Sequence, residues 1–353
     1  MSPSPTLVVR CDLGATSGVG HLMRCIALAE EFAARGSRVV FSAATAEVPF
    51  AQEQLRARGF EWVDPPAETP EDHLAQLGEI GADIVAVDSY HLPPAVYAGI
   101  RSAHTTLAMV DGDTAGRNAD LFLDQNLGAE LDDWPLPPSA IRLAGLDYAL
   151  MHDERVRARP VDTHTHVESE PPRLFAFFGG TDAFGAAPDV TRAVVATRRP
   201  LTLRVVGATE SIRAELAGLE PAPDQVVEVI EPTSALAEEV VTADLVVSAA
   251  GTSSWELLCL GAACAFLCVA DNQQVSYNRI TTLGVVAGLG RLEQVREDPE
   301  GAVRRLGRLL DDPAERDRLR TEAGRLVDGQ GRVRVAEAVL GQWRQRAGHA
   351  RLI

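Results

Sequence analysis

The sequence contains no lysine, so all 33 of its basic residues are arginines. This absence excludes the lysine of nucleotide-binding P-loops, Schiff-base lysines and lysine general bases. Aromatic residues make up only 5% of the chain, whereas apolar residues make up 46%. The core must therefore be aliphatic, which suits buried parallel strands covered by helices. An arginine- and alanine-rich chain without lysine also suggests a GC-rich coding sequence.

Several other features are missing. No run of about 20 apolar residues is present, so we predict no membrane span. The first residues, Met1–Pro5, lack the basic and apolar regions of a signal peptide. None of the five cysteines forms a Cys-x-x-Cys pair, so we expect small core residues in a reducing, cytoplasmic compartment. The net charge of −17 argues against nucleic acid or an anionic membrane as a partner.

The chain is long enough for two domains, since it has 353 residues. Expected strands and helices alternate over residues 1–157 and again over 173–330, which predicts a doubly wound parallel sheet in each half. The polar, proline-rich residues 158–172 are interpreted as a linker. Residues 331–353 are expected to form a C-terminal helix. The expected strands are 7–9, 38–42, 61–63, 84–88 and 105–110, short candidates at 121–123 and 141–143, and then 174–178, 201–206, 226–230, 245–248 and 263–269.

Two histidines of the linker, His164 and His166, are possible metal ligands. The sequence pattern places no cysteine or carboxylate cluster beside them, and we therefore expect solvated side chains and no metal.

His21 follows a short strand and a glycine-rich loop, and apolar residues after it recur at helical spacing. At a helix start the dipole disfavours a positive imidazole, which suits a general base. One alternative is a dinucleotide-binding fingerprint, for which Gly18 and Gly20 supply two glycines, although Met23 occupies the third position. The other alternative is a simple turn. We favour an active-site loop centred on His21.

Polar residues gather where expected strands end, and in parallel sheets ligands bind beyond the carboxyl ends of the strands. If the two halves face each other, both sets of residues line one cleft. These residues are Asp12, His21, Asp88, Tyr90, Asp111 and Asp113 in the first half, and Gly179, Gly180, Asp182, Ser248, Gly251, Thr252, Asn272 and Gln273 in the second.

The segment from Ser248 to Glu256 carries the strongest signal of the second half. A buried strand runs into a loop of small residues, and a helix is expected to start near Thr252. Free N–H groups at such a start hold phosphate, and the hydroxyls of Thr252 and Ser253 can add hydrogen bonds. Glu256 is placed to accept from ribose hydroxyls. The alternative is a capping motif, but with Gly179–Gly180 and Asn272–Gln273 nearby we favour phosphate binding.

Asp111-Gly-Asp113 has the pattern of a divalent-metal pair in nucleotide-sugar enzymes. Alternatively, one carboxylate faces substrate and the other makes a loop hydrogen bond. Because a helix terminus is already available for the diphosphate, we favour the metal-free interpretation.

Together these motifs resemble those of the UDP-sugar hydrolase of pseudaminic acid synthesis and of related spore-coat polysaccharide proteins. The second half also resembles the nucleotide-binding half of the glycosyltransferase that completes lipid II. The motifs that carry the resemblance are Asp12, Gly18-x-Gly20-His21-x-x-Arg24, Asp88-x-Tyr90, Gly179-Gly-x-Asp182, Ser248-x-x-Gly-Thr-x-x-x-Glu256 and Asn272-Gln273.

The resemblance implies an α/β fold of the GT-B type, with two facing Rossmann-like domains, an interdomain cleft and UDP bound mainly by the second domain. The last helix would cross back to the first domain. The implied chemistry is metal-independent and inverting, with a UDP-sugar as co-substrate and no further cofactor. His21 matches the general base of the family, and Asp12 or Asp113 is expected to orient His21 or the acceptor. Substrate contacts are expected from Gly20, Arg24, Asp88, Tyr90, Asp111, Asn272 and Gln273, and UDP contacts from Gly179, Gly180, Thr181, Asp182, Ser248, Gly251, Thr252, Ser253 and Glu256.

The acceptor decides between two activities. Attack by water would make the enzyme a hydrolase, whereas attack by an alcohol, an amine or a heterocycle nitrogen would make it a glycosyltransferase. We favour transfer to a small acceptor, such as the nucleobase of cytosylglucuronic acid synthases, because the GC-rich composition suits natural-product pathways. A third possibility is an inactive nucleotide-sugar-binding protein, and the presence of His21, Asp12 and Asp113 argues against it.

Overall fold

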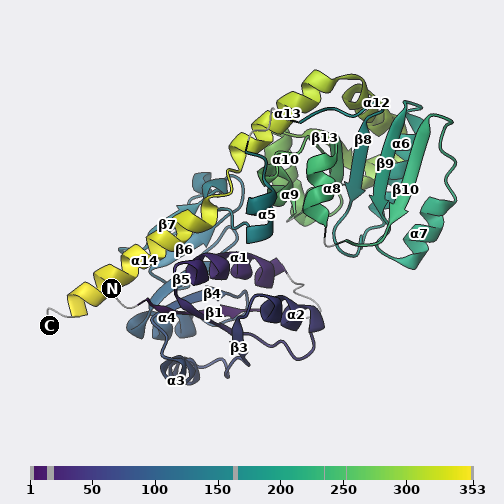
Figure 1. Ribbon diagram of the computed structural model, residues 1–353. Coiled ribbons are helices and arrows are strands. Elements are labelled where there is room, and N and C mark those ends of the chain that lie inside the picture. Colours follow the sequence, from purple (N-terminus) through teal and green to yellow (C-terminus); the bar gives the residue numbers. More distant parts are fainter. Residues whose placement is uncertain (1–3, 14–19, 162–165, 234, 252, 351–353) are drawn as a thin grey trace. The chain divides into compact units, whose positions relative to one another are not determined.

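The chain forms two α/β units, each built on one parallel sheet (Figure 1). Unit 1 comprises Met1–Asp153 and Gly329–Ile353, and unit 2 comprises Glu154–Asp328. Residues 158–172, the expected linker, therefore fall within unit 2. The prediction of two doubly wound parallel sheets is confirmed. The computed structural model describes residues 4–13, 20–161, 166–233, 235–251 and 253–350, with the side chains of 349 and 350 left aside.

The sheet of unit 1 has seven strands in the order β3-β2-β1-β4-β5-β6-β7. The chain adds β2 and β3 on one side of β1 and all later strands on the other, so the strand order reverses between β1 and β4. The short strands that we expected at 121–123 and 141–143 are confirmed as β6 and β7. The strands are β1 (Thr6–Cys11), β2 (Arg38–Ser42), β3 (Glu61–Val63), β4 (Ile84–Asp88), β5 (Thr105–Met109), β6 (Leu121–Asp124) and β7 (Ile141–Ala144).

Helices connect these strands, and local sequence signals define their ends. In α3 the Thr69 hydroxyl accepts the N–H of Asp72 at 3.2 Å, Pro70 occupies the first turn, and Gly81 ends the helix with φ of +75°. These helices are α1 (Gly20–Ala34), α2 (Pro49–Ala57), α3 (Pro70–Ile80) and α4 (Pro94–Ala103). The next helix, α5 (Asp153–Ala158), follows the last strand of unit 1 and belongs to unit 2 from Glu154 onward.

The C-terminal helix α14 (Gly331–Ala350) belongs to unit 1 and packs against α1 (Figure 1). Its buried Val335, Ala336, Val339 and Leu340 join the same apolar cluster as the inner side chains of α1. At its start, the Arg332 guanidinium forms ion pairs with carboxylates of unit 1, including Asp153 at 2.5 Å and Glu30 at 3.3 Å. Apolar packing and these ion pairs together hold the two ends of the chain in one unit.

The sheet of unit 2 has six strands in the order β10-β9-β8-β11-β12-β13, and its strand order reverses between β8 and β11. The strands are β8 (Arg173–Phe177), β9 (Leu201–Val206), β10 (Gln225–Ile230), β11 (Leu245–Ala249), β12 (Cys264–Cys268) and β13 (Ala287–Arg291). The helices are α6 (Ala186–Ala196), α7 (Glu210–Ala217), α8 (Leu236–Thr242), α9 (Ser254–Cys259), α10 (Gln274–Thr282), α11 (Leu292–Glu297), α12 (Pro299–Asp311) and α13 (Pro313–Leu326).

The edge strand β13 was not predicted, because Ala-Gly-Leu-Gly-Arg lacks β-branched and aromatic residues. Its glycines have a packing reason. A Cβ atom at Gly288 would lie 2.7 Å from the Tyr277 hydroxyl of α10, and Gly290 has φ of +103°. The Tyr277 hydroxyl also accepts the N–H of Gly290 at 2.7 Å. The glycines therefore let α10 approach the sheet edge closely.

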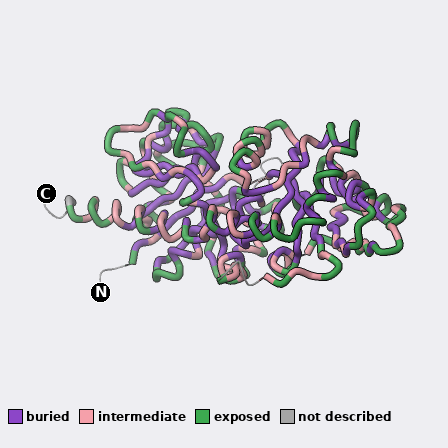
Figure 2. Tube along the Cα trace, turned by 90° about the horizontal axis from the view of Figure 1, so that it is seen from above, coloured by how far each residue is buried: buried purple, intermediate pink, exposed green. Residues whose placement is uncertain are grey.

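The buried residues are mostly aliphatic. Figure 2 shows where buried, intermediate and exposed residues lie along the chain. All residues of β4, β5, β11 and β12 are buried, as expected for parallel strands covered on both faces. Over the residues that the structure describes, no helix has the length and apolar character needed to cross a membrane.

Candidate active site

The strand-order reversal in unit 1 brings together two polar segments that are far apart in the sequence. β1 pairs with β4, and Cys11 lies opposite Asp88 at the carboxyl ends of the two strands. α1 starts with Gly20 after the loop that follows β1. In doubly wound sheets this reversal point is where ligands bind.

His21 and Asp88 form a buried pair at this point. His21 Nδ1 lies 2.7 Å from Asp88 Oδ1, and the two residues are 7% and 1% exposed. Burial alone would raise the pKa of Asp88, but the Arg24 charge and the hydrogen bonds from Arg24 and His21 hold it below its ordinary value. Asp88 is therefore an anion that can only accept, so Nδ1 carries a proton, and in the neutral form of the imidazole Nε2 holds the lone pair.

Arg24 connects this pair to a second carboxylate. Its Nε donates to Asp88 Oδ2 and its Nη2 to Oδ1, both at 2.6 Å. Its Nη1 reaches Asp111 Oδ1, beyond β5, at 3.2 Å. Burial alone would raise the pKa of Asp111, but Arg24 and donors from Tyr90 and Asn126 lower it. We expected Arg24 to contact substrate, and in the structure its guanidinium is bonded to two carboxylates of the protein.

Tyr90 lies at the exposed side of this network. Its hydroxyl donates to Asp111 Oδ2, and its ring meets the His21 ring edge-on, with centroids 4.7 Å apart at 83°. Burial and the bond to Asp111 raise the pKa of Tyr90, so the phenol stays protonated at neutral pH. Asn126 Nδ2 donates to Asp111 at 2.7 Å. Sequence reasoning missed Asn126, although it follows β6 closely and that position was a usable signal.

Asp12 and Asp113 both make contacts within the protein. Asp12 accepts the N–H of Tyr90 at 3.0 Å and pairs with Arg10 at 3.2 Å. Asp113 accepts the N–H of Ala115 at 2.9 Å, a loop contact within its own turn. We expected Asp12 or Asp113 to orient His21 or the acceptor, and in the structure the contact with His21 is made by Asp88, because β4 is the direct neighbour of β1.

The glycine-rich loop before His21 is only partly described by the structure. Gly20 begins α1, and a Cβ atom there would meet nothing within 4 Å. Gly18, the other glycine of the loop, lies outside the described residues.

In unit 2 the strand-order reversal places the loops after β8 and β11 beside each other. Gly179 has φ of +84°, and a Cβ atom at Gly179 or Gly180 would meet no atom within 4 Å. This exposed backbone suits close approach of a ligand. Thr181 is exposed, whereas Asp182 is buried, and its carboxylate accepts the N–H groups of Ala186 and Ala187 at 2.8 and 2.9 Å. Asp182 therefore stabilises the start of α6.

Some polar groups between Ser248 and Glu256 form hydrogen bonds within the protein. The Ser248 hydroxyl donates to the carbonyl of Phe177 at 2.8 Å and is buried. α9 begins at Ser254 and has six residues, with Ser253 before it and no side-chain cap bond at that position. Thr252 lies outside the described residues. Gly251 has the Gln273 amide nitrogen 3.4 Å from where its Cβ atom would be.

Glu256 and the residues after β12 complete the candidate nucleotide site. Glu256 Oε2 accepts from Arg155 Nε at 2.8 Å, a partner that sequence reasoning missed because Arg155 belongs to no motif. Gln273 Oε1 accepts the N–H of Val269 at 3.1 Å, and Asn272 is exposed.

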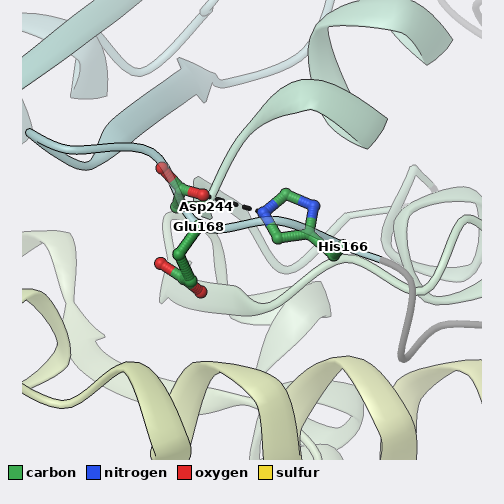
Figure 3. A group of neighbouring side chains, drawn as sticks. All are labelled: His166, Glu168 and Asp244. Carbon is green, nitrogen blue, oxygen red and sulfur yellow. Dashed lines mark hydrogen bonds and ion pairs between the residues drawn. The ribbon is translucent and has the colours of Figure 1, made fainter.

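A separate group in unit 2 has the composition of a metal site. His166, Glu168 and Asp244 place ligand atoms within 4.8 Å of one another (Figure 3). His166 Nε2 lies 2.8 Å from Asp244 Oδ1. However, the Glu168 carboxylate receives Arg316 and Arg320, with Arg320 Nη1 at 2.9 Å. Two guanidinium groups already balance the acidic charge, so the arrangement is that of an ion-pair network that fixes residues 166–168. His164 lies outside the described residues.

Comparison with solved structures shows the class of fold. The chain is similar to MurG of Acinetobacter baumannii, with 14% identity over 96% of this chain and 100% of that chain and a TM-score of 0.69. It is also similar to the glycotransferase of kitacinnamycin, with 15% identity over 96% and 99% of the chains and a TM-score of 0.65. Arabidopsis thaliana UGT89C1 complexed with UDP matches with 12% identity over 95% and 99% and a TM-score of 0.62. The fold is that of GT-B glycosyltransferases. No family model and no curated protein matches the sequence.

Proposed function

We propose that the protein is a UDP-sugar-dependent, inverting enzyme of the GT-B type. It breaks the anomeric C1–O bond, releases UDP and transfers the glycosyl group to a small acceptor. The observation that carries this proposal is the buried His21–Asp88 pair at the strand-order reversal of unit 1. It is a base with a fixed tautomer at the ligand-binding edge of the sheet.

In this mechanism His21 Nε2 removes the proton of the acceptor as the bond between C1 and UDP lengthens. The transition state has oxocarbenium character, as in other reactions at the anomeric carbon. Asp88 stabilises the imidazolium that forms, because its carboxylate already accepts the Nδ1 proton. A positioned base of this kind contributes about 10²–10⁴-fold to rate.

The proposed UDP site is in unit 2. The open backbone at Gly179 and Gly180 supports it, since N–H groups there can approach a diphosphate. Gly251 and Ser253 follow β11, the strand next to β8. Glu256 is the proposed ribose contact, and its bond to Arg155 fixes one carboxylate oxygen. The exposed Asn272 and the neighbouring Gln273 are the proposed sugar contacts.

The proposed reaction needs no metal ion. Asp111 accepts from Arg24, Tyr90 and Asn126, and Asp113 accepts a loop N–H. These bonds support the interpretation of the two residues as protein-stabilising carboxylates rather than a metal pair. Charge on the departing diphosphate would be met by backbone N–H groups of unit 2.

Product analysis tests the proposal. The protein is incubated with a panel of UDP-sugars in EDTA, with and without candidate acceptors that include free cytosine, and products are followed by NMR. The proposal predicts UDP release with an acceptor-linked glycoside of inverted anomeric configuration. Release of the free inverted sugar at the same rate without acceptor would identify a UDP-sugar hydrolase instead. Turnover that requires added magnesium or manganese would overturn the metal-free mechanism, and UDP binding without turnover would indicate a binding protein.

A further inference from the structure

Arg24 is the residue on which the polar network of unit 1 converges. Its guanidinium binds both oxygens of Asp88 at 2.6 Å and reaches Asp111 at 3.2 Å, and its side chain is only 14% exposed. Arg24 thereby joins the carboxylate at the end of β4 to the carboxylate after β5. An arginine bonded in this way has little donor capacity left for a substrate.

The same guanidinium lies directly beside the proposed base. Arg24 Nη2 is 3.3 Å from His21 Nδ1. Because Asp88 accepts from both groups, Nδ1 and Nη2 each carry a hydrogen. The two nitrogens are therefore neighbouring donors, and neither accepts from the other. A permanent cation at this distance opposes a second positive charge on the imidazole, while Asp88 favours it.

We infer that Arg24 is a positioning residue that keeps His21 available as a neutral base by sharing the charge of Asp88 and opposing protonation of the imidazole. This role differs from the substrate contact expected from the sequence. The kinetic part of the inference rests on the proposed function, but the effect on the imidazole itself does not.

The other charged groups that the structure describes near His21 are paired with one another or with Arg24. Asp111 contacts Arg24 on the far side of the guanidinium, and Asp12 is paired with Arg10. Residues 14–19 contain no ionisable side chain. Among the described residues of unit 1, the charged and titratable groups joined to His21 directly or through this network are Asp88, Arg24, Tyr90, Asp111, Asp12, Arg10 and Cys25, whose buried thiol lies 3.7 Å from Asp88 and has a raised pKa.

An NMR titration of the free protein tests the inference without any substrate. The histidines are labelled with ¹³C, and the His21 signal is identified by its loss in His21→Asn. In Arg24→Gln the cation is removed, and we expect the midpoint of the His21 titration to move to higher pH than in the wild type. Arg35→Gln is the matched control, because Arg35 pairs with Glu31 at the other end of α1. Its His21 titration should equal that of the wild type.

The rate measurements carry the second part of the inference. In Arg24→Gln the acid limb of kcat/KM against pH should move upward together with the His21 titration. Arg24→Lys keeps the charge but loses the two-pronged bond to Asp88, so its acid limb should stay near that of the wild type while kcat falls. A loss of activity with no shift in either pH profile would mean that Arg24 only supports the fold.

A His21 midpoint that is unchanged or lowered in Arg24→Gln would overturn the inference. If that variant does not fold, Arg24→Gln/Asp111→Asn removes one cation and one anion together, and a smaller upward shift is expected because loss of the Asp111 charge partly offsets it. Absence of turnover in every variant and in the wild type would contradict the proposed function, and the titration would still decide the role of Arg24.

Discussion

Replacing Asp88 by asparagine tests the best-defined contact of the site. In the wild type, Arg24 donates to both Asp88 oxygens and His21 donates to one of them. An amide has a single oxygen, so one of these donors must face an NH₂ group instead. If the NH₂ group faces His21, the imidazole must accept at Nδ1 and carry its proton on Nε2, where it can no longer act as a base.

The expected magnitudes follow from this geometry. Asp88→Asn should lower kcat by about 10²–10⁴-fold, the usual contribution of a positioned base. The free energy of unfolding should fall by about 3 kcal/mol, the lower part of the range for a broken buried ion pair, because Arg24 keeps Asp111 as a partner. UDP affinity should not change, since the proposed UDP contacts belong to unit 2.

The assay measures initial rates of UDP release with the best donor of the panel, UDP affinity by calorimetry and stability by urea unfolding. Asp120→Asn is the matched control, because Asp120 is a buried carboxylate of unit 1 that pairs with Arg101 at 2.9 Å. It should lose stability but keep kcat within a few-fold of the wild type. An Asp88→Asn enzyme with near wild-type turnover would refute the assignment of the pair.

Two further predictions concern unit 2. Glu256→Ala should weaken UDP binding by about 1–3 kcal/mol if the carboxylate bonds the ribose, and calorimetry that shows unchanged affinity would remove Glu256 from the site. Asp244→Asn should lower the free energy of unfolding by about 3 kcal/mol at pH 7. Although burial alone would raise the pKa of Asp244, bonds from His166, Arg173 and Ser169 lower it. The ionised Asp244 carboxylate therefore stabilises the folded protein fully above about pH 4, and this contribution is lost as the pH falls through the lowered pKa. The free energies of unfolding of the wild type and the variant should converge in acid. A difference between them in urea unfolding that does not change with pH would contradict this prediction.

The fold was largely predictable, because parallel strands buried on both faces appear in sequence as short apolar runs between helical patterns. Residues 84–88 and 201–206 were predicted with the bounds that the structure has. The edge strand 287–291 was missed, since its glycines are selected by the close approach of Tyr277 and not by strand propensity.

The positions of candidate site residues were easier to predict than their partners. Asp12, Asp88 and Asp113 all lie at or beyond the carboxyl ends of strands, and the sequence pattern does not predict which strand pairs with β1. Their partners depend on sheet order, which placed Asp88 against His21. Likewise, the sequence around Ser248 is the same whether its hydroxyl binds a ligand or donates to a backbone carbonyl. In the structure it donates to the carbonyl of Phe177.

His21 is the proposed base that activates the acceptor. The most direct measurement is the turnover of His21→Asn with the best UDP-sugar and acceptor, together with its UDP affinity by calorimetry. We predict a fall in kcat of about 10²–10⁴-fold with UDP affinity unchanged, since the proposed UDP contacts belong to the other unit. Near wild-type turnover would assign the base to another residue, and loss of UDP binding would make His21 a structural residue of its loop; either result would contradict the account.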